Sequence, residues 1–397
     1  MANAVWRGAC VALFWLALVG ILYTYVGYPV VIALLARWRR RPVRSAPITP
    51  TVTLLIAAYN EEACIAEKLD NSLALDYPAD RLEIAVVADG SNDRTCEIVQ
   101  GYVERSAEGG PPVRLLWESE RRGKPAALIR AIPLTQGEII VFSDANSYFP
   151  GDALHKLVRH FADPEVGGAS GAKRVGAQAQ GGAASHGEGL YWRYEAFIKA
   201  CESAVSSVMG VPGEIWAARR AAYVNSEANS LIEDFVASLR MVAAGWRIVY
   251  EPEAYAYEEG SASLRAEWIR RTRMAAGGWQ SFFQLPGMLR HPRKLLTWQY
   301  LSHRMLRWMV TPSLFVLLLL VNLPLAREPF YMVTLAAQGL FYILAGLGWL
   351  LGGGHRKGRL PGWLLAPFYV CFLNAVALAG GWRYLRGKQS VVWRKAR

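Results

Sequence analysis

The feature that most constrains this chain is the uneven placement of its hydrophobic residues, which make up 53% of its 397 residues. They are concentrated in the first forty residues and in the last hundred, whereas charged and turn-forming residues fill the middle. A single water-soluble core would distribute them more evenly. The pattern therefore predicts a water-exposed domain of about 200–250 residues held between membrane anchors.

The first hydrophobic run, Gly8–Ala36, is longer than the ~20 residues that a helix needs to cross a bilayer. It leads directly into a basic cluster, without the small-residue cleavage site of a signal peptide, so we expect an uncleaved, tilted anchor. The cluster consists of Arg37, Arg39, Arg40, Arg41 and Arg44. Because basic residues stay on the cytoplasmic side, we expect a multi-pass protein of the inner (plasma) membrane whose following domain is cytoplasmic.

Three more apolar segments follow the middle of the chain, at about Trp308–Ala326, Pro329–Leu351 and Trp363–Gly381. The stretch Ser281–Trp298 mixes apolar and basic residues, which predicts helices that lie along the membrane surface. If all three late segments cross, the C-terminus lies outside, yet the tail after Gly381 is strongly basic. Either one late segment does not fully cross, or the tail breaks the charge rule.

The formal net charge is +12, and much of the positive charge lies beside the apolar segments. This placement favours lipid headgroups as the partner of the basic residues and argues against nucleic acid. The five cysteines are Cys10, Cys64, Cys96, Cys201 and Cys371. Their odd number and wide spacing predict a reducing compartment without a disulfide framework.

The middle of the chain alternates predicted strands with predicted helices. Strands are expected at Thr51–Ala57, Glu83–Ala88, Val113–Trp117 and Glu138–Ser143, with helices beginning near Glu61, Asp93 and Lys124. This alternation predicts an α/β domain with a mostly parallel sheet, whose ligands bind at the carboxyl ends of the strands. No Gly-x-Gly-x-x-Gly follows the first strand and no Walker-type loop is present, which argues against dinucleotide redox chemistry and P-loop hydrolysis.

Five short motifs in the middle domain resemble those of the family-2 inverting glycosyltransferases, in the same order. They are Ala57-Ala58-Tyr59-Asn60-Glu61, Asp89-Gly90-Ser91, Gly123-Lys124, Ser143-Asp144-Ala145-Asn146 and Glu233-Asp234. The resemblance covers about residues 50–280. The family includes the cellulose, hyaluronan and poly-N-acetylglucosamine synthases. It implies a GT-A fold, a mostly parallel sheet flanked by helices, with terminal transmembrane helices and interfacial helices.

On this basis we expect five regions along the chain. An N-terminal anchor occupies residues 1–40 and a cytoplasmic GT-A domain residues 50–262. Amphipathic interfacial helices occupy residues 263–305, transmembrane helices residues 306–383, and a basic tail residues 384–397.

The resemblance also implies roles for individual residues. The donor-binding set would be Ala57, Tyr59, Glu61, Asp89, Ser91, Lys124, Asp144, Arg270 and Arg273. Asp144 would hold Mg2+ or Mn2+, because hard oxygen ligands suit these ions, and Asn146 stands where the family often has a second Asp. Asp234 would be the base that deprotonates the acceptor hydroxyl, with Glu233 beside it.

Each role has a simpler alternative. Asp144 could cap a turn, and Lys124 could be a solvated surface lysine. The acidic pair Glu233 and Asp234 could serve only to stabilise a helix N-terminus. The arginines near residue 270 could face lipid headgroups. The agreement of five ordered motifs favours the catalytic interpretation.

One departure from the family concerns chain growth. Processive synthases commonly carry Gln-x-x-Arg-Trp, whereas this chain has Arg270-Arg271-Thr272-Arg273-Met274, so the Trp that stacks on the acceptor sugar is replaced by Met274. Residues Gly210–Gly213 resemble the family's Gly-containing acceptor turn.

The sequence thus predicts transfer from a UDP-sugar to a growing cell-surface or extracellular polysaccharide. The first alternative is single transfer to a membrane lipid, either polyprenyl phosphate or diacylglycerol. The second is a non-catalytic subunit that binds nucleotide sugar. The expected partners are a UDP-sugar, a saccharide or lipid-linked acceptor, membrane lipids and, in some assemblies, an accessory subunit.

Overall fold

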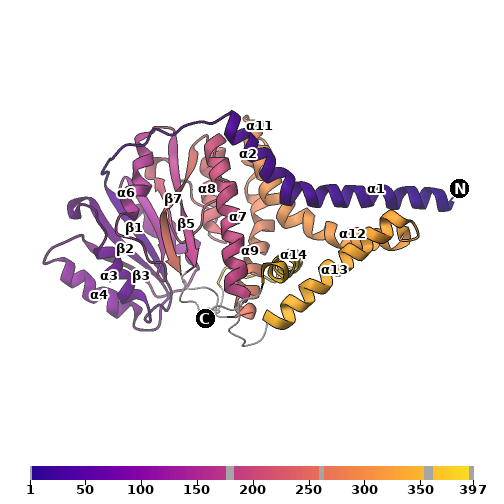
Figure 1. Cartoon of the computed structure of the whole chain (residues 1–397). Coiled ribbons are helices and arrows are strands. Elements are labelled where there is room, and N and C mark those ends of the chain that lie inside the picture. The colour runs from indigo at the N-terminus through magenta and orange to yellow at the C-terminus, as the bar shows by residue number, and fades with distance from the viewer. Residues whose placement is uncertain (1, 176–182, 259–262, 353–360, 393–397) are drawn as a thin grey trace.

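The computed structural model describes residues 2–175, 183–258, 263–352 and 361–392. An α/β domain occupies one end of the molecule, and long helices extend away from it (Figure 1). Elements from both ends of the chain and from its middle meet where the two parts join.

Seven of the described strands form one sheet in the order β3-β2-β1-β4-β6-β5-β7. They are β1 Val52–Ala58, β2 Leu82–Asp89, β3 Val113–Glu118, β4 Ile139–Asp144, β5 Val166–Val175, β6 Trp216–Arg219 and β7 Arg247–Glu258. Strands β3, β2, β1 and β4 run parallel, whereas β6 is antiparallel to both of its neighbours. The predicted mostly parallel sheet and GT-A fold class are confirmed, and the four predicted strands lie within about a residue of their expected positions.

The apolar strands are buried on both faces, as expected for a parallel sheet covered by helices. On one face, Leu54 and Ile56 of β1 pack against α3, α4 and α6. On the other, Leu55 faces a core that includes α5 and α8. The helices are α3 Ile65–Leu73, α4 Thr95–Ser106, α5 Lys124–Ala131, α6 Ala153–Val158 and α8 Glu233–Ala243.

The second core continues past the sheet into helices that the sequence places near the membrane. Leu285, Met288, Leu296 and Tyr300 belong to the same buried cluster as Leu55 and Phe235. These helices are α9 Leu264–Gln284, α10 Pro286–Leu289, α11 Lys294–Gln299 and the π-helix η6 Tyr300–Val310. Helix α9 therefore borders the α/β domain on one side and the membrane helices on the other.

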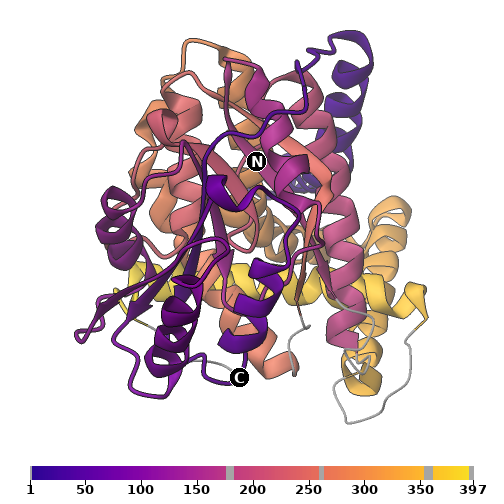
Figure 2. The ribbon, with the colours of Figure 1, turned by 90° about the vertical axis from the view of Figure 1, so that its left-hand side faces the viewer.

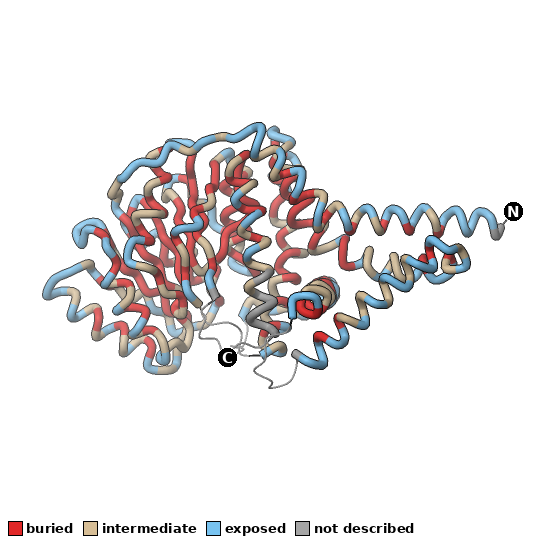
Figure 3. The backbone as a smooth tube through the Cα atoms, in the orientation of Figure 1, coloured by how far each residue is buried: buried red, intermediate tan, exposed pale blue. Residues whose placement is uncertain are grey.

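Within the described residues, four helical stretches are long and apolar enough to cross a membrane: Ala4–Trp38, Lys294–Leu325, Pro329–Leu351 and Gly362–Leu385. The first consists of α1 Ala2–Leu22, η1 Tyr23–Gly27 and α2 Tyr28–Trp38, and the others end in α12 Thr311–Leu325, α13 Pro329–Gly352 and α14 Gly362–Leu385. Along α1 and α13 large apolar side chains are exposed, for example Val5 at 72% and Trp349 at 60% (Figure 3). Such a surface is suited to lipid and not to water.

Helix α14 does not run in the direction of α1. It is seen end-on in Figure 1, where α1, α12 and α13 are seen from the side, and it runs from side to side in Figure 2. Small residues permit close contact with α9: a β-carbon added to Gly380 would lie 2.5 Å from Ala275 Cβ and 2.7 Å from the Thr272 carbonyl oxygen. Helix α14 therefore runs beside α9, with further contacts from Tyr369 to Glu267 and from Tyr384 to Phe283.

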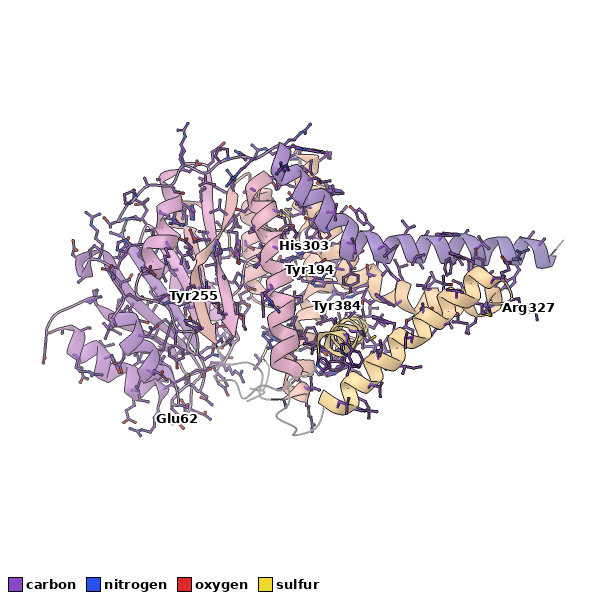
Figure 4. The ribbon with its side chains drawn as sticks, viewed as in Figure 1. Glu62, Tyr194, Tyr255, His303, Arg327 and Tyr384 are labelled. Atoms are coloured by element: carbon purple, nitrogen blue, oxygen red, sulfur yellow. The ribbon has the colours of Figure 1, made fainter. Side chains whose placement is uncertain are left out.

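After α14 the chain returns to the α/β domain. Gly387, with φ of +63°, follows the helix end, and the Lys388 N–H donates to the Arg383 carbonyl. Val391 then lies against Gly123, because a β-carbon at Gly123 would be 2.9 Å from Val391 Cγ1. The opposite tip of the molecule carries the turn between α12 and α13, where Glu328 is ion-paired with Arg7 and Arg327 is labelled in Figure 4.

Buried ion pairs join α7 Ala183–Val205 to η6 near the junction labelled by Tyr194 and His303 in Figure 4. His303 Nδ1 lies 2.8 Å from Glu202, and Arg304 lies 2.6 Å from Glu195. Arg304 also donates to the Met209 carbonyl, at the start of the Gly210–Gly213 turn. The sequence placed the start of an apolar span at Trp308, whereas the helical stretch begins at Lys294 and its first half carries these buried charges.

Candidate active site

The carboxyl ends of three parallel strands bring the first predicted site residues together. Ala57 on β1 pairs in register with Val87 on β2 and with Asp144 on β4. Asp89 ends β2, opposite Glu118 on β3. Ala57, Asp89 and Asp144 therefore lie along one edge of the sheet, where the alternating pattern predicts ligand binding.

The loops after β1 and β2 are joined by hydrogen bonds between motif residues. Asn60 adopts a φ of +53°, and its N–H donates to Ser91 Oγ at 3.1 Å. The Glu61 N–H donates to Thr95 Oγ1 at 2.7 Å. Tyr59 lies under the guanidinium of Arg121, which is 3.4 Å from the ring centroid. Several motif residues thus shape these loops, and Ser91 uses its hydroxyl in that way.

Asp89 is 5% exposed and anchors the loop that precedes α5. Its two carboxylate oxygens accept the N–H groups of Arg122, at 3.0 Å, and Gly123, at 2.7 Å. Gly123 has a φ of +96°, a conformation that favours glycine. This anchoring directs Lys124, the first residue of α5, toward the sheet edge.

Lys124 lies between carboxylates from two different elements. Its Nζ is 2.7 Å from Asp144 Oδ1 and 3.0 Å from Glu233 Oε1. Burial by itself would lower the pKa of Lys124, but Asp144, Glu233 and Asp234 outweigh it and raise the pKa well above its usual value. Lys124 is therefore a fixed positive charge inside the site and not a solvated surface lysine.

Glu233 and Asp234 are the first two residues of α8. They therefore also stabilise the helix N-terminus, as the simpler alternative predicts. Burial would raise the pKa of Glu233, but Lys124 and Arg273 hold it below the usual value. Burial, reinforced by the charge of Glu233, raises the pKa of Asp234 to about 7. Asp234 is thus a half-buried carboxyl group that exchanges its proton near neutral pH.

The Gly210–Gly213 turn, which resembles the family's acceptor turn, contacts Asp234 directly. A β-carbon at Gly213 would lie 3.2 Å from Asp234 Oδ2 and 3.3 Å from Lys124 Nζ. Glycine at this position therefore lets the backbone approach both groups. A cavity of about 10 Å³, room for about one water molecule, adjoins them and is lined by Ala57, Ser143 and Trp216 among others.

The two predicted arginines on α9 differ in their surroundings. Arg273 donates to the Leu231 carbonyl at 3.1 Å and feels the charges of Glu233, Asp234 and Asp144, while burial lowers its pKa. Arg270 is ion-paired with the fully buried Glu267 at 2.8 Å. Arg273 thus belongs to the Asp234 side of the site, and Arg270 is held by a carboxylate of its own helix.

Three charged residues that the sequence analysis did not single out complete the site. Lys173, on β5, is ion-paired with Glu214 at 2.7 Å and with Glu258 at the end of β7. Glu258 also accepts from the Asn146 amide at 2.7 Å. One signal was present in the sequence, since Lys173 and Arg174 are charged residues that follow a run of small ones, Ser170-Gly171-Ala172.

The expected divalent cation would need oxygen ligands from the side chains around Asp144. The described residues contain no group of three or more His, Cys, Asp or Glu side chains arranged to hold a metal. Asp144 has a partly exposed carboxylate, and Asn146 lies two residues further along. Mg2+ and Mn2+ commonly use one or two carboxylates together with substrate phosphates. The residues present fit an ion shared with a bound diphosphate, but not a site built by protein alone.

Comparison with known proteins gives the following matches. The family model described as Glycosyltransferase like family 2 matches residues 50–311. The beta-monoglucosyldiacylglycerol synthase of Synechocystis sp. is 27% identical over 319 residues, which cover 79% of this chain and 63% of that protein. The poly-beta-1,6-N-acetyl-D-glucosamine synthase of Staphylococcus aureus is 27% identical over 259 residues, covering 62% and 60%. The chain thus matches less than two thirds of the length of these relatives.

Among solved structures, the mannosyltransferase PcManGT from Pyrobaculum calidifontis, in complex with GDP-Man and Mn2+, is similar throughout. The TM-score is 0.71 at 24% identity, and the match covers 95% of this chain and 100% of that one. At this identity the likeness establishes the fold, including the helices outside the α/β domain.

Proposed function

The chain belongs to the Glycosyltransferase like family 2, and we propose that it transfers a sugar from a UDP-sugar to a membrane-associated acceptor with inversion at the anomeric carbon. The observation that carries the proposal is the arrangement of Asp234, a half-buried carboxyl group with a pKa of about 7, beside Lys124. A general base is most effective when its pKa lies near the working pH.

In the proposed reaction, the acceptor oxygen attacks the anomeric carbon as the bond to the diphosphate breaks. Asp234 takes the acceptor's proton, so no covalent enzyme intermediate is needed. Lys124, at the N-terminus of α5, and Arg273 stabilise the charge that develops on the leaving diphosphate. The loops that carry Tyr59, Glu61 and Ser91, together with Ala57 and Asp89, would hold the nucleoside.

A divalent cation would be held by Asp144, with Asn146 as a weaker ligand. Bound there with the diphosphate, Mg2+ or Mn2+ would supply Lewis-acid stabilisation of the leaving group. Lys124 Nζ lies 2.7 Å from Asp144 Oδ1, so its ammonium group and a cation held by Asp144 would both face the diphosphate. The Mn2+ in the structure of PcManGT is consistent with such a site.

The acceptor is either a growing polysaccharide or a membrane lipid, and the relatives include enzymes named for each. Two observations favour a lipid. Met274 replaces the Trp that would stack on a sugar chain. A cavity of about 440 Å³, lined largely by apolar side chains of α1, α12 and α13, opens among the long helices. The relatives are named as enzymes, which argues against a purely non-catalytic subunit.

We also propose that α1, α12 and α13 cross the membrane while α14 lies along its surface. In this arrangement the basic C-terminal segment lies on the same side of the membrane as the arginines that follow α2. The C-terminal tail then no longer breaks the positive-inside rule. Val391 against Gly123 supports it, since the C-terminal segment reaches the α/β domain. The positive-inside rule then places the domain in the cytoplasm.

The proposal can be tested with purified protein in nanodiscs, supplied with a panel of UDP-sugars and Mn2+ or Mg2+. We expect UDP release from one donor and a product that partitions into organic solvent if the acceptor is a lipid, or a high-molecular-mass product if it is a polysaccharide. Asp234→Asn should lower turnover by about 10²–10⁴-fold while UDP binding persists, whereas Asp80→Asn on the exposed surface should have no effect. Turnover like wild type in Asp234→Asn would refute the assignment.

A further inference from the structure

Lys68, on α3, is a fully buried lysine in the α/β domain that takes no part in the proposed reaction. Its ammonium group donates to the Ser147 carbonyl and lies 4.1 Å from the centroid of the Phe149 ring. Both residues belong to the segment 145–149, here called the Asp144 loop because it follows the last residue of β4. Neither contact neutralises the charge of a buried lysine, so packing alone does not explain a lysine at this position.

Helix α3 holds the backbone of the Asp144 loop through a second side chain as well. Asn71 lies three residues after Lys68, on the same face of the helix. Its amide donates to the Phe149 carbonyl at 2.8 Å and accepts the Phe149 N–H at 2.9 Å. The Ser147 N–H in turn donates to the Asp144 carbonyl at 3.2 Å. The position of the loop relative to Asp144 therefore depends on α3.

The other side of the Asp144 loop is attached to the end of β7. Tyr148 and Tyr257 exchange two backbone hydrogen bonds, of 3.0 and 2.8 Å. Asn146 donates to Glu258 at 2.7 Å through its amide nitrogen, a bond that does not use its amide oxygen. The loop is thus held from two sides, and loss of the α3 contacts would leave it attached along β7.

Helix α3 also connects the Asp144 loop to the loop that is proposed to hold the nucleoside. The N–H groups of Cys64 and Ile65, at the start of the helix, donate to the Glu61 carbonyl at 3.0 and 2.9 Å. A nucleotide whose diphosphate shares a cation with Asp144 would extend from one loop to the other. Its binding therefore requires the two loops to keep a fixed separation, and α3 is an element that contacts both.

We propose that Lys68 is a positioning residue, which holds the Asp144 loop where Asp144 and Asn146 can share a divalent cation with the donor diphosphate. The inference rests on the proposed function, because it requires a cation at Asp144. Lys68 acts through the backbone of the loop and contacts neither the cation nor the donor. Replacing residues that orient metal ligands typically lowers metal affinity about 10–100-fold.

The charge of Lys68 and its hydrogen bond to the loop predict opposite effects on metal binding. Burial lowers the pKa of Lys68 to about 7, while the charge of Asp144 opposes this shift. The two groups thus act on each other electrostatically, and a charged Lys68 would repel a cation at Asp144. If charge alone mattered, removing the ammonium group would strengthen cation binding. If the position of the loop matters, the same change weakens it.

Lys68→Met distinguishes the two effects, because methionine is unbranched, apolar and suited to a buried position. With the full-length protein in nanodiscs and saturating UDP, calorimetry should show Mn2+ binding about 10–100-fold weaker than in wild type. UDP binding without metal should be unchanged. In the transfer assay, the Mn2+ concentration for half-maximal UDP release should rise by the same factor, while kcat at saturating Mn2+ stays close to that of wild type.

Two further variants complete the test. Lys156→Met, on α6, is the matched control, because Lys156 is paired with Asp152 at 2.6 Å and should not affect Mn2+ binding. Asn71→Ala removes both bonds to Phe149 and should weaken Mn2+ binding in the same direction as Lys68→Met. It provides an independent test if Lys68→Met does not fold, which thermal unfolding determines.

Mn2+ binding as tight as in wild type, or tighter, in the folded variants would overturn the inference while leaving the proposed function intact. An unchanged Mn2+ affinity with a lower unfolding temperature would do the same, because it would show a structural role only. If the wild-type protein itself binds UDP but no Mn2+, the cation site fails and the inference fails with it. The failures are distinguishable because the first two appear only in the variants and the last in wild type.

Discussion

At the scale of single residues, the central feature is Lys124, which contacts two carboxylates. A third carboxyl group, Asp234, stays protonated up to near-neutral pH. Lys124 contacts Asp144 and Glu233, and with Arg273 it holds the pKa of Glu233 below its usual value. Asp234 is half-buried, and desolvation together with the negative charge of Glu233 raises its pKa. Adjacent acids in one helical turn thus acquire different proton affinities, which suits one as a charged partner and the other as a base.

The raised pKa of Asp234 predicts the pH dependence of transfer. A base must be deprotonated to act, so kcat/KM should increase with pH and reach a plateau above about pH 7. Glu233→Gln should move this rise to lower pH, because it removes the charge that raises the pKa of Asp234. Glu108→Gln should leave the profile unchanged. A rate that is flat between about pH 5 and 8 would contradict the assignment of Asp234 as the base.

The same shift affects stability. The folded state binds a proton at Asp234 more tightly than the unfolded chain does, so this contribution to stability is present at low pH. It is lost as the pH rises through about 7.

The scarcity of acidic ligands around Asp144 predicts that metal binding depends on nucleotide. By calorimetry, Mn2+ should bind at least about tenfold more tightly when UDP is present, since phosphate oxygens would complete its coordination. Asp144→Asn should abolish this enhancement, whereas Asp152→Asn, on the exposed end of α6, should not. Tight Mn2+ binding by the protein without nucleotide would contradict this prediction.

At the scale of elements, the contact between α9 and α14 connects the site to the membrane helices. Arg273 lies on α9, and the same helix presents Ala275 and the Thr272 carbonyl to Gly380 of α14. Close approach of two helices through small residues leaves no room for an added methyl group. The position of α14 is therefore sensitive to substitution at this contact.

Gly380→Ala should destabilise the protein by about 1–3 kcal/mol, although alanine is the better helix former. The new β-carbon would lie 2.5 Å from Ala275 Cβ, so one helix must move. Gly339→Ala on α13, where no atom lies within 4 Å, is the matched control and should be neutral or slightly stabilising. Thermal unfolding in detergent measures both, and equal midpoints would refute the close contact.

At the scale of the whole molecule, the N-terminus and the turn between α12 and α13 lie at one end, and the α/β domain and residue 391 at the other (Figure 1). A molecule with this arrangement can cross a membrane through α1, α12 and α13 and return its C-terminal segment to the domain. The basic residues after α2 and after α14 then share one side.

Labelling with a membrane-impermeant maleimide checks this topology. In a variant whose five native cysteines are replaced by alanine, Ser390→Cys and Asp80→Cys should be labelled from the same side of the membrane. Arg327→Cys should be labelled from the opposite side. Labelling of residues 390 and 327 from the same side would contradict the proposed arrangement.

Much of the fold and part of the site follow from the sequence alone. Alternating apolar runs and ordered motifs were sufficient to predict the parallel strands, the GT-A fold class and the positions of Ala57, Asp89 and Asp144 at one sheet edge, because these depend on local periodicity and strand order. Hydropathy was sufficient to locate the long apolar helices, since it depends on composition.

Other features were decided by the tertiary structure. The direction of α14 depends on the contact between Gly380 and Ala275. Hydropathy could not predict this direction, because it is the same for a helix that crosses a membrane and for one that lies along it. The ion-pair group of Lys173, Glu214 and Glu258 gathers residues from separate elements. The pKa of Asp234 depends on burial and on charges brought close by folding. Sequence patterns report what is local, whereas proximity between distant residues and exclusion of water exist only in the folded chain.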